Sequence, residues 1–103
     1  MDKYGLIGYP LGHSFSRNYF NEKFENEGID AKYINFEIPH IEDLTEILDT
    51  TPELKGLNVT IPYKEKVISY RDFISPEATA IGAVNVIKVE HHGYDVKLKG
   101  YNS

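Results

Sequence analysis

The chain has 103 residues, of which 41% are hydrophobic and 26% charged, proportions typical of one globular domain. Its net charge is −5 and no run of lysines and arginines occurs, so we expect no nucleic acid partner. The absence of cysteine excludes disulfides and thiolate metal sites, and it favours a cytoplasmic location. No apolar run approaches the roughly 18 residues of a membrane helix, so no membrane association is expected.

The first half of the chain alternates predicted strands with predicted helices. Residues 3–9 have the apolar pattern of a buried strand and lead into a loop rich in glycine and proline. Ser14 is a typical N-cap, and the apolar spacing after it predicts a helix that ends at Gly28. Residues 31–38 alternate as a second strand. Residues 41–50 predict a second helix, with its acidic residues near the start as the helix dipole favours.

The second half predicts three more strands and two short helices. The predicted strands are 56–61, 83–90 and 94–103, and the predicted helices are 63–73 and 75–82. Ser75 caps the last of these helices and Pro76 takes its first position. His91, His92 and Gly93 are typical of a hairpin turn. Together the elements predict an α/β fold, a three-layer sandwich with a largely parallel mixed sheet and a C-terminal β-hairpin.

A first candidate site lies in residues 8–16, GYPLGHSFS, where glycines stand at a strand-to-helix junction. Such junctions bind anions, because the free N–H groups of a helix start attract negative charge. The spacing fits neither G-x-G-x-x-G nor a Walker A loop. Ser14 and Ser16 would offer two hydroxyls there, which suits a carboxylate better than a triphosphate. The alternative is that Ser14 is only a cap and Ser16 a polar residue of the first turn.

A second candidate is residues 57–66, LNVTIPYKEK. Asn58 and Thr60 point to the same face of the predicted strand, and the apolar residues between them take the other face. Lys64 would fall in the first turn of the next helix, where its charge opposes the helix dipole by about 0.3–1 kcal/mol. Such a local inconsistency often marks a functional residue, here one suited to acid–base chemistry. The alternative is a solvated edge strand followed by a surface lysine.

A third candidate is Asn85, which lies within the apolar stretch IGAVNV. A buried amide without hydrogen-bond partners costs about 1–3 kcal/mol. Asn85 is therefore either satisfied by backbone groups or faces a polar ligand. No metal site is expected, because the four histidines lack the spacing of metal ligands; they are His13, His40, His91 and His92.

These segments together resemble the substrate-binding domain of the shikimate dehydrogenase family. Four blocks carry the resemblance, in the family's order and over nearly the whole chain. They are S-x-S at residues 14–16, N-V-T-x-P-x-K at 58–64, A-x-x-I-G-A-V-N at 78–85 and G-x-N-[ST] at 100–103. The sequence departs from the pattern at Arg17, where the family often has proline, and at Phe20, where histidine is common.

The resemblance implies an oxidoreductase of aromatic amino-acid biosynthesis. Ser14 and Ser16 would bind the carboxylate of shikimate or 3-dehydroshikimate. Lys64 would be the catalytic acid–base group, protonating the carbonyl oxygen while NADPH delivers hydride. The residues that the resemblance implies for the ring hydroxyls are Asn58, Thr60 and Asn85.

The family also has two parts that this sequence lacks. One is an aspartate directly after the closing G-x-N-[ST] block, which partners the lysine, and the other is a nucleotide-binding domain. The resemblance therefore implies that residues 1–103 are a substrate-binding domain truncated before the NADP-binding domain, inactive alone and without bound cofactor. Two alternatives remain: a domain of a quinate/shikimate dehydrogenase, or a non-catalytic module that binds small carboxylates.

Overall fold

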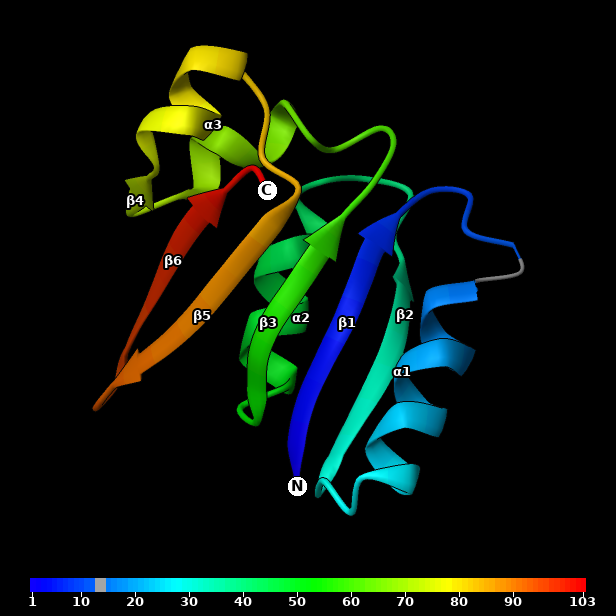
Figure 1. Cartoon of the computed structure of the whole chain (residues 1–103). Helices are drawn as coiled ribbons and strands as arrows, with labels where there is room; N and C mark the ends of the chain where they lie inside the picture. The colour runs from blue at the N-terminus through cyan, green and yellow to red at the C-terminus, as the bar shows by residue number, and fades with distance from the viewer. Residues whose placement is uncertain (13–14) are drawn as a thin grey trace.

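Over residues 1–12 and 15–103, the computed structural model shows a six-stranded sheet with helices packed against it (Figure 1). The strands are β1 (Asp2–Gly8), β2 (Ala31–Glu37), β3 (Leu54–Val59), β4 (Phe73–Ile74), β5 (Val86–His92) and β6 (Asp95–Tyr101). The α-helices are α1 (Phe15–Asn26), α2 (Asp43–Thr50) and α3 (Pro76–Ile81), and η1 (Lys66–Tyr70) is a 3-10 helix. This element order confirms the predicted α/β class.

The strand order of the sheet is β2-β1-β3-β5-β6-β4. Strand β1 runs parallel to β2 and β3, and β4 runs parallel to β6. Strand β5 is antiparallel to both β3 and β6, and β5 and β6 form the predicted C-terminal hairpin. As a result, the ends of β1, β2, β3 and β6 and the beginning of β5 all meet at one edge of the sheet (Figure 1).

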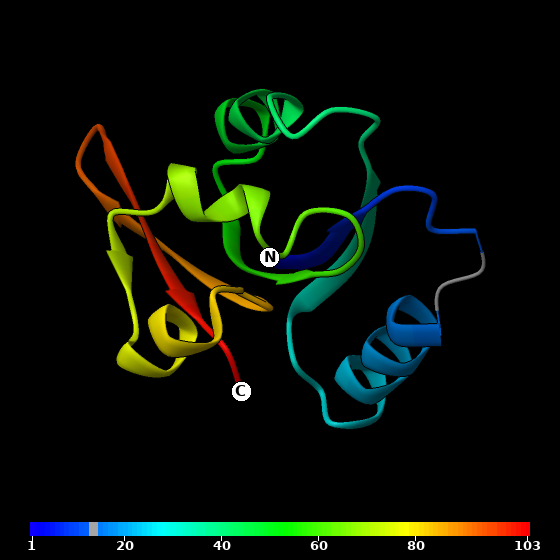
Figure 2. The same cartoon turned by 90° about the horizontal axis from the view of Figure 1, so that it is seen from above.

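Helices cover both faces of the sheet, which confirms the predicted three layers (Figure 2). Helix α1 packs mainly on β2, on the opposite face from α2. The face toward α2 is the dry core, because alternate apolar side chains of the central strands point there. Leu57 and Val59 of β3 are 2% and 3% exposed, and Leu44 of α2 is fully buried. Burying such a side chain contributes about 1.5–3 kcal/mol to folding.

Two predicted boundaries between residues 59 and 74 are wrong, one because of a long-range strand pairing and the other because of a local turn. The predicted helix 63–73 shrinks to η1, since Phe73 and Ile74 instead pair with β6. The third strand ends at Val59, two residues early, because Tyr63 N donates to Thr60 O (3.0 Å) and closes a turn.

The hairpin turn also differs from the prediction. His91 and His92 extend β5, and the turn itself falls on Gly93 and Tyr94. Gly93 has a φ of 65°, which glycine adopts without strain. The predicted cap of α3 is confirmed, because Ser75 Oγ accepts a hydrogen bond from Ala78 N (3.1 Å). The predicted cap at Ser14 lies outside the described residues.

Candidate functional site

The candidate site lies at the sheet edge where β1, β2 and β3 end. In open α/β sheets, ligands bind beyond the carboxyl ends of parallel strands. Backbone hydrogen bonds join two of the predicted segments there. Val59 N donates to Asn85 O (2.8 Å), and Val84 N donates to Lys64 O (2.8 Å). The structure therefore brings the 58–64 segment and Asn85 together at this sheet edge.

Asn58 lies one residue before the end of β3 and faces the α1 side of the sheet. Its Nδ2 donates a hydrogen bond to the Tyr33 hydroxyl of β2 (2.8 Å). Tyr33 is only 3% exposed, and this burial raises the pKa of its phenol, while the hydrogen bond from Asn58 acts in the opposite direction. The sequence analysis missed Tyr33; the signal was a buried tyrosine, whose hydroxyl needs a partner.

Thr60 directly follows β3 and is not part of it, although the predicted strand 56–61 included this residue. Its backbone N donates to Ile7 O (3.0 Å), which keeps it at the end of β1. A Cβ added to Gly8 would lie 2.5 Å from the Thr60 methyl carbon, so glycine is required there. Because Gly8 has no side chain, β1 approaches Thr60 closely and restricts the position of its methyl carbon.

Lys64 is exposed, in a turn that precedes η1. The prediction that it occupies the first turn of a helix is wrong, because η1 begins at Lys66 and has five residues. The argument from the helix dipole therefore does not apply. Within residues 1–12 and 15–103, no ion pair engages the Lys64 ammonium. That group is accessible to a ligand at the sheet edge.

Asn85 is held by backbone groups, one of the two alternatives that its sequence left open. Its Nδ2 donates to Ser103 O (3.0 Å), and its Oδ1 accepts from Ser103 N (3.1 Å). A primary amide has two N–H donors and two acceptor lone pairs, so each end retains one further hydrogen bond. A contact between Asn85 and a ligand remains a prediction.

The glycine loop is fastened to β2 by Glu37, a second residue that the sequence analysis missed. The Glu37 carboxylate accepts hydrogen bonds from Leu11 N (2.5 Å) and Gly12 N (3.4 Å). These two loop N–H groups are thus engaged within the protein. An anion at this loop would have to rely on serine hydroxyls and the start of α1, where Ser16 is partly buried. Ser14 lies outside the described residues.

An apolar groove of about 460 Å³ runs along the α1 side of the sheet. It shares Asn58 with the predicted site residues, and its other lining residues include Tyr4, Phe20, Phe24 and Tyr33. The groove is therefore a neighbour of the candidate site.

Within the described part of the chain, no group of three acidic, histidine or cysteine side chains could hold a metal ion. No described helix is long and apolar enough to cross a membrane.

Comparison with known proteins decides the family. The family model for the shikimate dehydrogenase substrate binding domain matches residues 6–87, most of the chain. This chain belongs to that family. The assignment confirms the resemblance carried by the four sequence blocks.

The curated relatives that this chain matches are shikimate dehydrogenases longer than the chain itself. A shikimate dehydrogenase (NADP(+)) from Clostridium beijerinckii is 46% identical over 105 residues, covering 100% of this chain and 37% of the relative. One from Methanocaldococcus jannaschii is 42% identical, covering 96% of this chain and 34% of the relative. The chain thus spans about a third of the length of the curated relatives that it matches.

Solved structures of the family share the fold. Shikimate dehydrogenase 1 from Peptoclostridium difficile has a TM-score of 0.82 and 42% identity, over 99% of this chain and 37% of that one. The Thermus thermophilus enzyme in complex with shikimate has a TM-score of 0.83 and 32% identity, over 99% of this chain and 38% of that one. The substrate-binding domain fold is therefore established for this chain.

Proposed function

We propose that residues 1–103 form the substrate-binding domain of a two-domain shikimate dehydrogenase, which reduces 3-dehydroshikimate to shikimate with NADPH. The observation that carries this proposal is the gathering of Asn58, Thr60, Lys64 and Asn85 at one sheet edge, in a member of this family. Solved relatives that bind shikimate and NADP(H) support the choice of ligands. The cysteine-free composition also fits the cytoplasmic location predicted from the sequence.

Reduction of a ketone requires a hydride for carbon and a proton for oxygen. Lys64 supplies the proton: its exposed ammonium, free of ion pairs within the described residues, donates it to the carbonyl oxygen. In the reverse direction the neutral amine accepts it from the ring hydroxyl. Asn58 and Thr60 hold the neighbouring hydroxyls, so that the reacting carbon faces one side. Ser14 and Ser16 bind the ring carboxylate at the start of α1.

The nicotinamide cofactor belongs to a second domain in this proposal. Residues 1–103 contain no G-x-G-x-x-G loop, and therefore no site suited to a dinucleotide pyrophosphate. When bound, NADPH supplies the hydride. The substrate-binding domain recognises the carboxylate and the ring hydroxyls of the substrate. Through Lys64 it also supplies the proton.

Steady-state kinetics of the full-length gene product test this function. The protein is mixed with 3-dehydroshikimate and either NADPH or NADH, and separately with shikimate or quinate and the oxidised cofactors. We expect turnover of the shikimate pair with a preference for NADP. No turnover of either shikimate or quinate would overturn the proposal, and a preference for quinate would reassign the substrate.

A further inference from the structure

The Asn58 amide is held by a hydrogen bond that reaches across β1, the strand that lies between β2 and β3. In the strand order β2-β1-β3, Tyr33 lies on β2 and Asn58 on β3, on opposite sides of β1. The 2.8 Å contact from Asn58 Nδ2 to the Tyr33 hydroxyl spans that strand on the α1 face. We propose that Tyr33 is a positioning residue, which fixes the orientation of the Asn58 amide toward the substrate.

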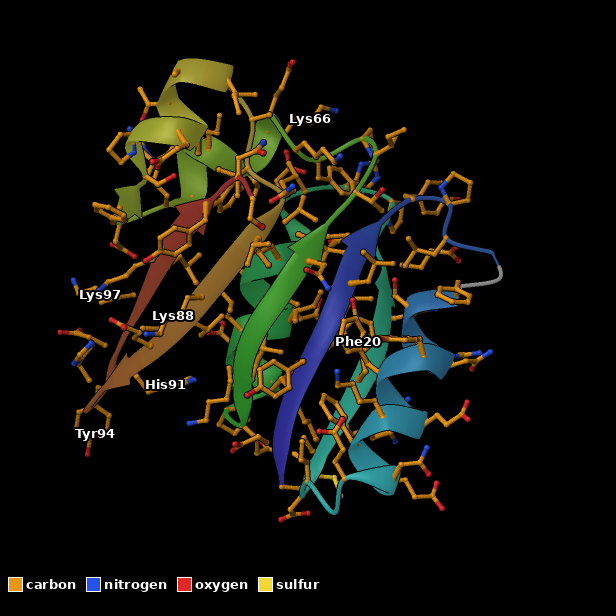
Figure 3. All side chains as sticks on the ribbon, viewed as in Figure 1. Phe20, Lys66, Lys88, His91, Tyr94 and Lys97 are labelled. Atoms are coloured by element: carbon orange, nitrogen blue, oxygen red, sulfur yellow. The ribbon has the colours of Figure 1, made fainter. Side chains whose placement is uncertain are left out.

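The Tyr33 side chain is itself held in place by α1. Its ring stacks on Phe20, with 4.9 Å between centroids and 21° between planes. Phe20 points from α1 toward the sheet (Figure 3). The Asn21 side chain also binds both backbone groups of Tyr33, donating to its O (3.0 Å) and accepting from its N (2.8 Å). The hydroxyl of Tyr33 therefore occupies a position that α1 and β2 define together.

The orientation of the Asn58 amide decides which of its hydrogen-bonding groups faces the substrate. The two ends of the Asn58 amide differ: one donates two hydrogens and the other accepts. With Nδ2 engaged by Tyr33, Oδ1 is the end left to accept a hydrogen bond from a ring hydroxyl. The Tyr33 hydroxyl holds Nδ2 in this orientation, and without it the amide loses that partner and can turn about its last torsion. Burial raises the pKa of the phenol, so it is neutral at neutral pH, and a lone pair of its oxygen accepts the hydrogen bond from Nδ2.

The inference rests on the proposed function, and its test uses the full-length protein with shikimate and NADP. Tyr33→Phe keeps the ring, its stacking on Phe20 and the backbone bonds, and removes only the hydroxyl. We expect kcat/KM for shikimate to fall roughly 2- to 10-fold, the value of one neutral hydrogen bond, with the KM for NADP unchanged. Tyr4→Phe is the matched control, because Tyr4 pairs with Tyr33 in the sheet and lines the same groove.

A double-mutant cycle separates positioning from a merely structural role. If Tyr33 acts through Asn58, Tyr33→Phe should have almost no effect on kcat/KM in an Asn58→Ala background. Equal kcat/KM values for wild type and Tyr33→Phe would overturn the inference, as would additive effects of the two substitutions. Failure of the wild type to turn over shikimate would instead overturn the proposed function, and the inference with it.

Discussion

The two asparagines of the candidate site are held in place by hydrogen bonds, whereas its lysine is not held by an ion pair within the described residues. Asn58 is fixed by the hydroxyl of Tyr33, and Asn85 by the backbone of Ser103. Lys64, in contrast, is exposed, and its ammonium has no ion-pair partner within residues 1–12 and 15–103. Recognition benefits from groups that are already fixed in the right geometry, and an acid–base group must come within hydrogen-bond reach of the reacting oxygen.

The largest effect is expected from Lys64→Met in the full-length protein. Loss of the proton donor should lower kcat for 3-dehydroshikimate reduction roughly 10²- to 10⁴-fold. Because the side chain is exposed and free of ion pairs within the described residues, the unfolding midpoint should hardly change. Stopped-flow or steady-state absorbance of NADPH measures the first effect, and thermal unfolding the second.

Lys66→Met is the matched control for that substitution. Lys66 begins η1 two residues later, and its ammonium lies 6.0 Å from the centre of the Tyr63 ring. Its replacement should leave kcat within about twofold of wild type. Equal losses of kcat in both variants would show that Lys64 has no special chemical role.

The second largest effect is expected from a substitution that loosens Tyr33, the residue that holds Asn58. Asn21→Ala removes both side-chain bonds to the backbone of Tyr33, leaving a partly buried N–H and C=O without partners. We expect it to lower the free energy of unfolding by about 1–3 kcal/mol. Urea denaturation monitored by circular dichroism gives the value. Asn18→Ala, at an exposed position of the same helix, should be neutral, and equal losses in the two variants would contradict the account.

A smaller effect is expected from loosening the glycine loop. Glu37→Ala removes the carboxylate that accepts from Leu11 N and Gly12 N, and that loop leads to the serines. If the loop binds substrate equally in the ground and transition states, as we propose, the KM for shikimate should rise roughly 2- to 10-fold while kcat changes little. Glu25→Ala, on an exposed part of α1, is the control. A selective loss of kcat would argue against this role.

The smallest effect concerns the hairpin, far from the site. Hydrogen bonds from Lys99, then Lys88 and His92, lower the pKa of Glu90 from 4.5 to about 2. Lys88 and Lys97 extend from the hairpin strands (Figure 3). Since the folded-state pKa is depressed, the stabilising contribution of Glu90 is complete above pH 4.5 and disappears as the pH falls through about 2.

Glu90→Gln therefore tests this pH dependence. Wild type should be slightly more stable than the variant above pH 4.5, and the difference should shrink toward pH 2. Urea unfolding across that pH range, with added salt as a second arm, measures it. Because these charges are exposed, salt should reduce the difference. A difference that is constant with pH would contradict the assignment.

Local patterns were enough to predict most of the fold. The longer strands and the α-helices were predicted from their apolar spacing, and Ser75 and Pro76 mark the start of α3. Four ordered motifs pointed to the family and to the candidate site residues, whose roles remain predictions. The error at η1 arose because the pairing of Phe73 and Ile74 with β6 is a long-range contact, invisible to local periodicity.

The supporting residues could not be predicted for the same reason. Tyr33 lies 25 residues from Asn58, and Glu37 lies 26 and 25 residues from the two loop N–H groups that it binds. Nothing in the spacing of either residue indicates its partner. The interpretation of Lys64 as a residue at a helix start was wrong. The backbone hydrogen bond from Val84 N to Lys64 O, which local patterns do not indicate, holds that turn at the sheet edge.

A crystal structure of the full-length protein with shikimate tests the central claim most directly. The account predicts the ligand at the edge beyond β1 and β3, with Asn58 and Thr60 on its ring hydroxyls and the Lys64 ammonium within hydrogen-bond reach of the reacting oxygen. The Asn58 amide should keep its bond to Tyr33. Shikimate bound in the apolar groove, or at the edge without contact to Lys64, would contradict the account.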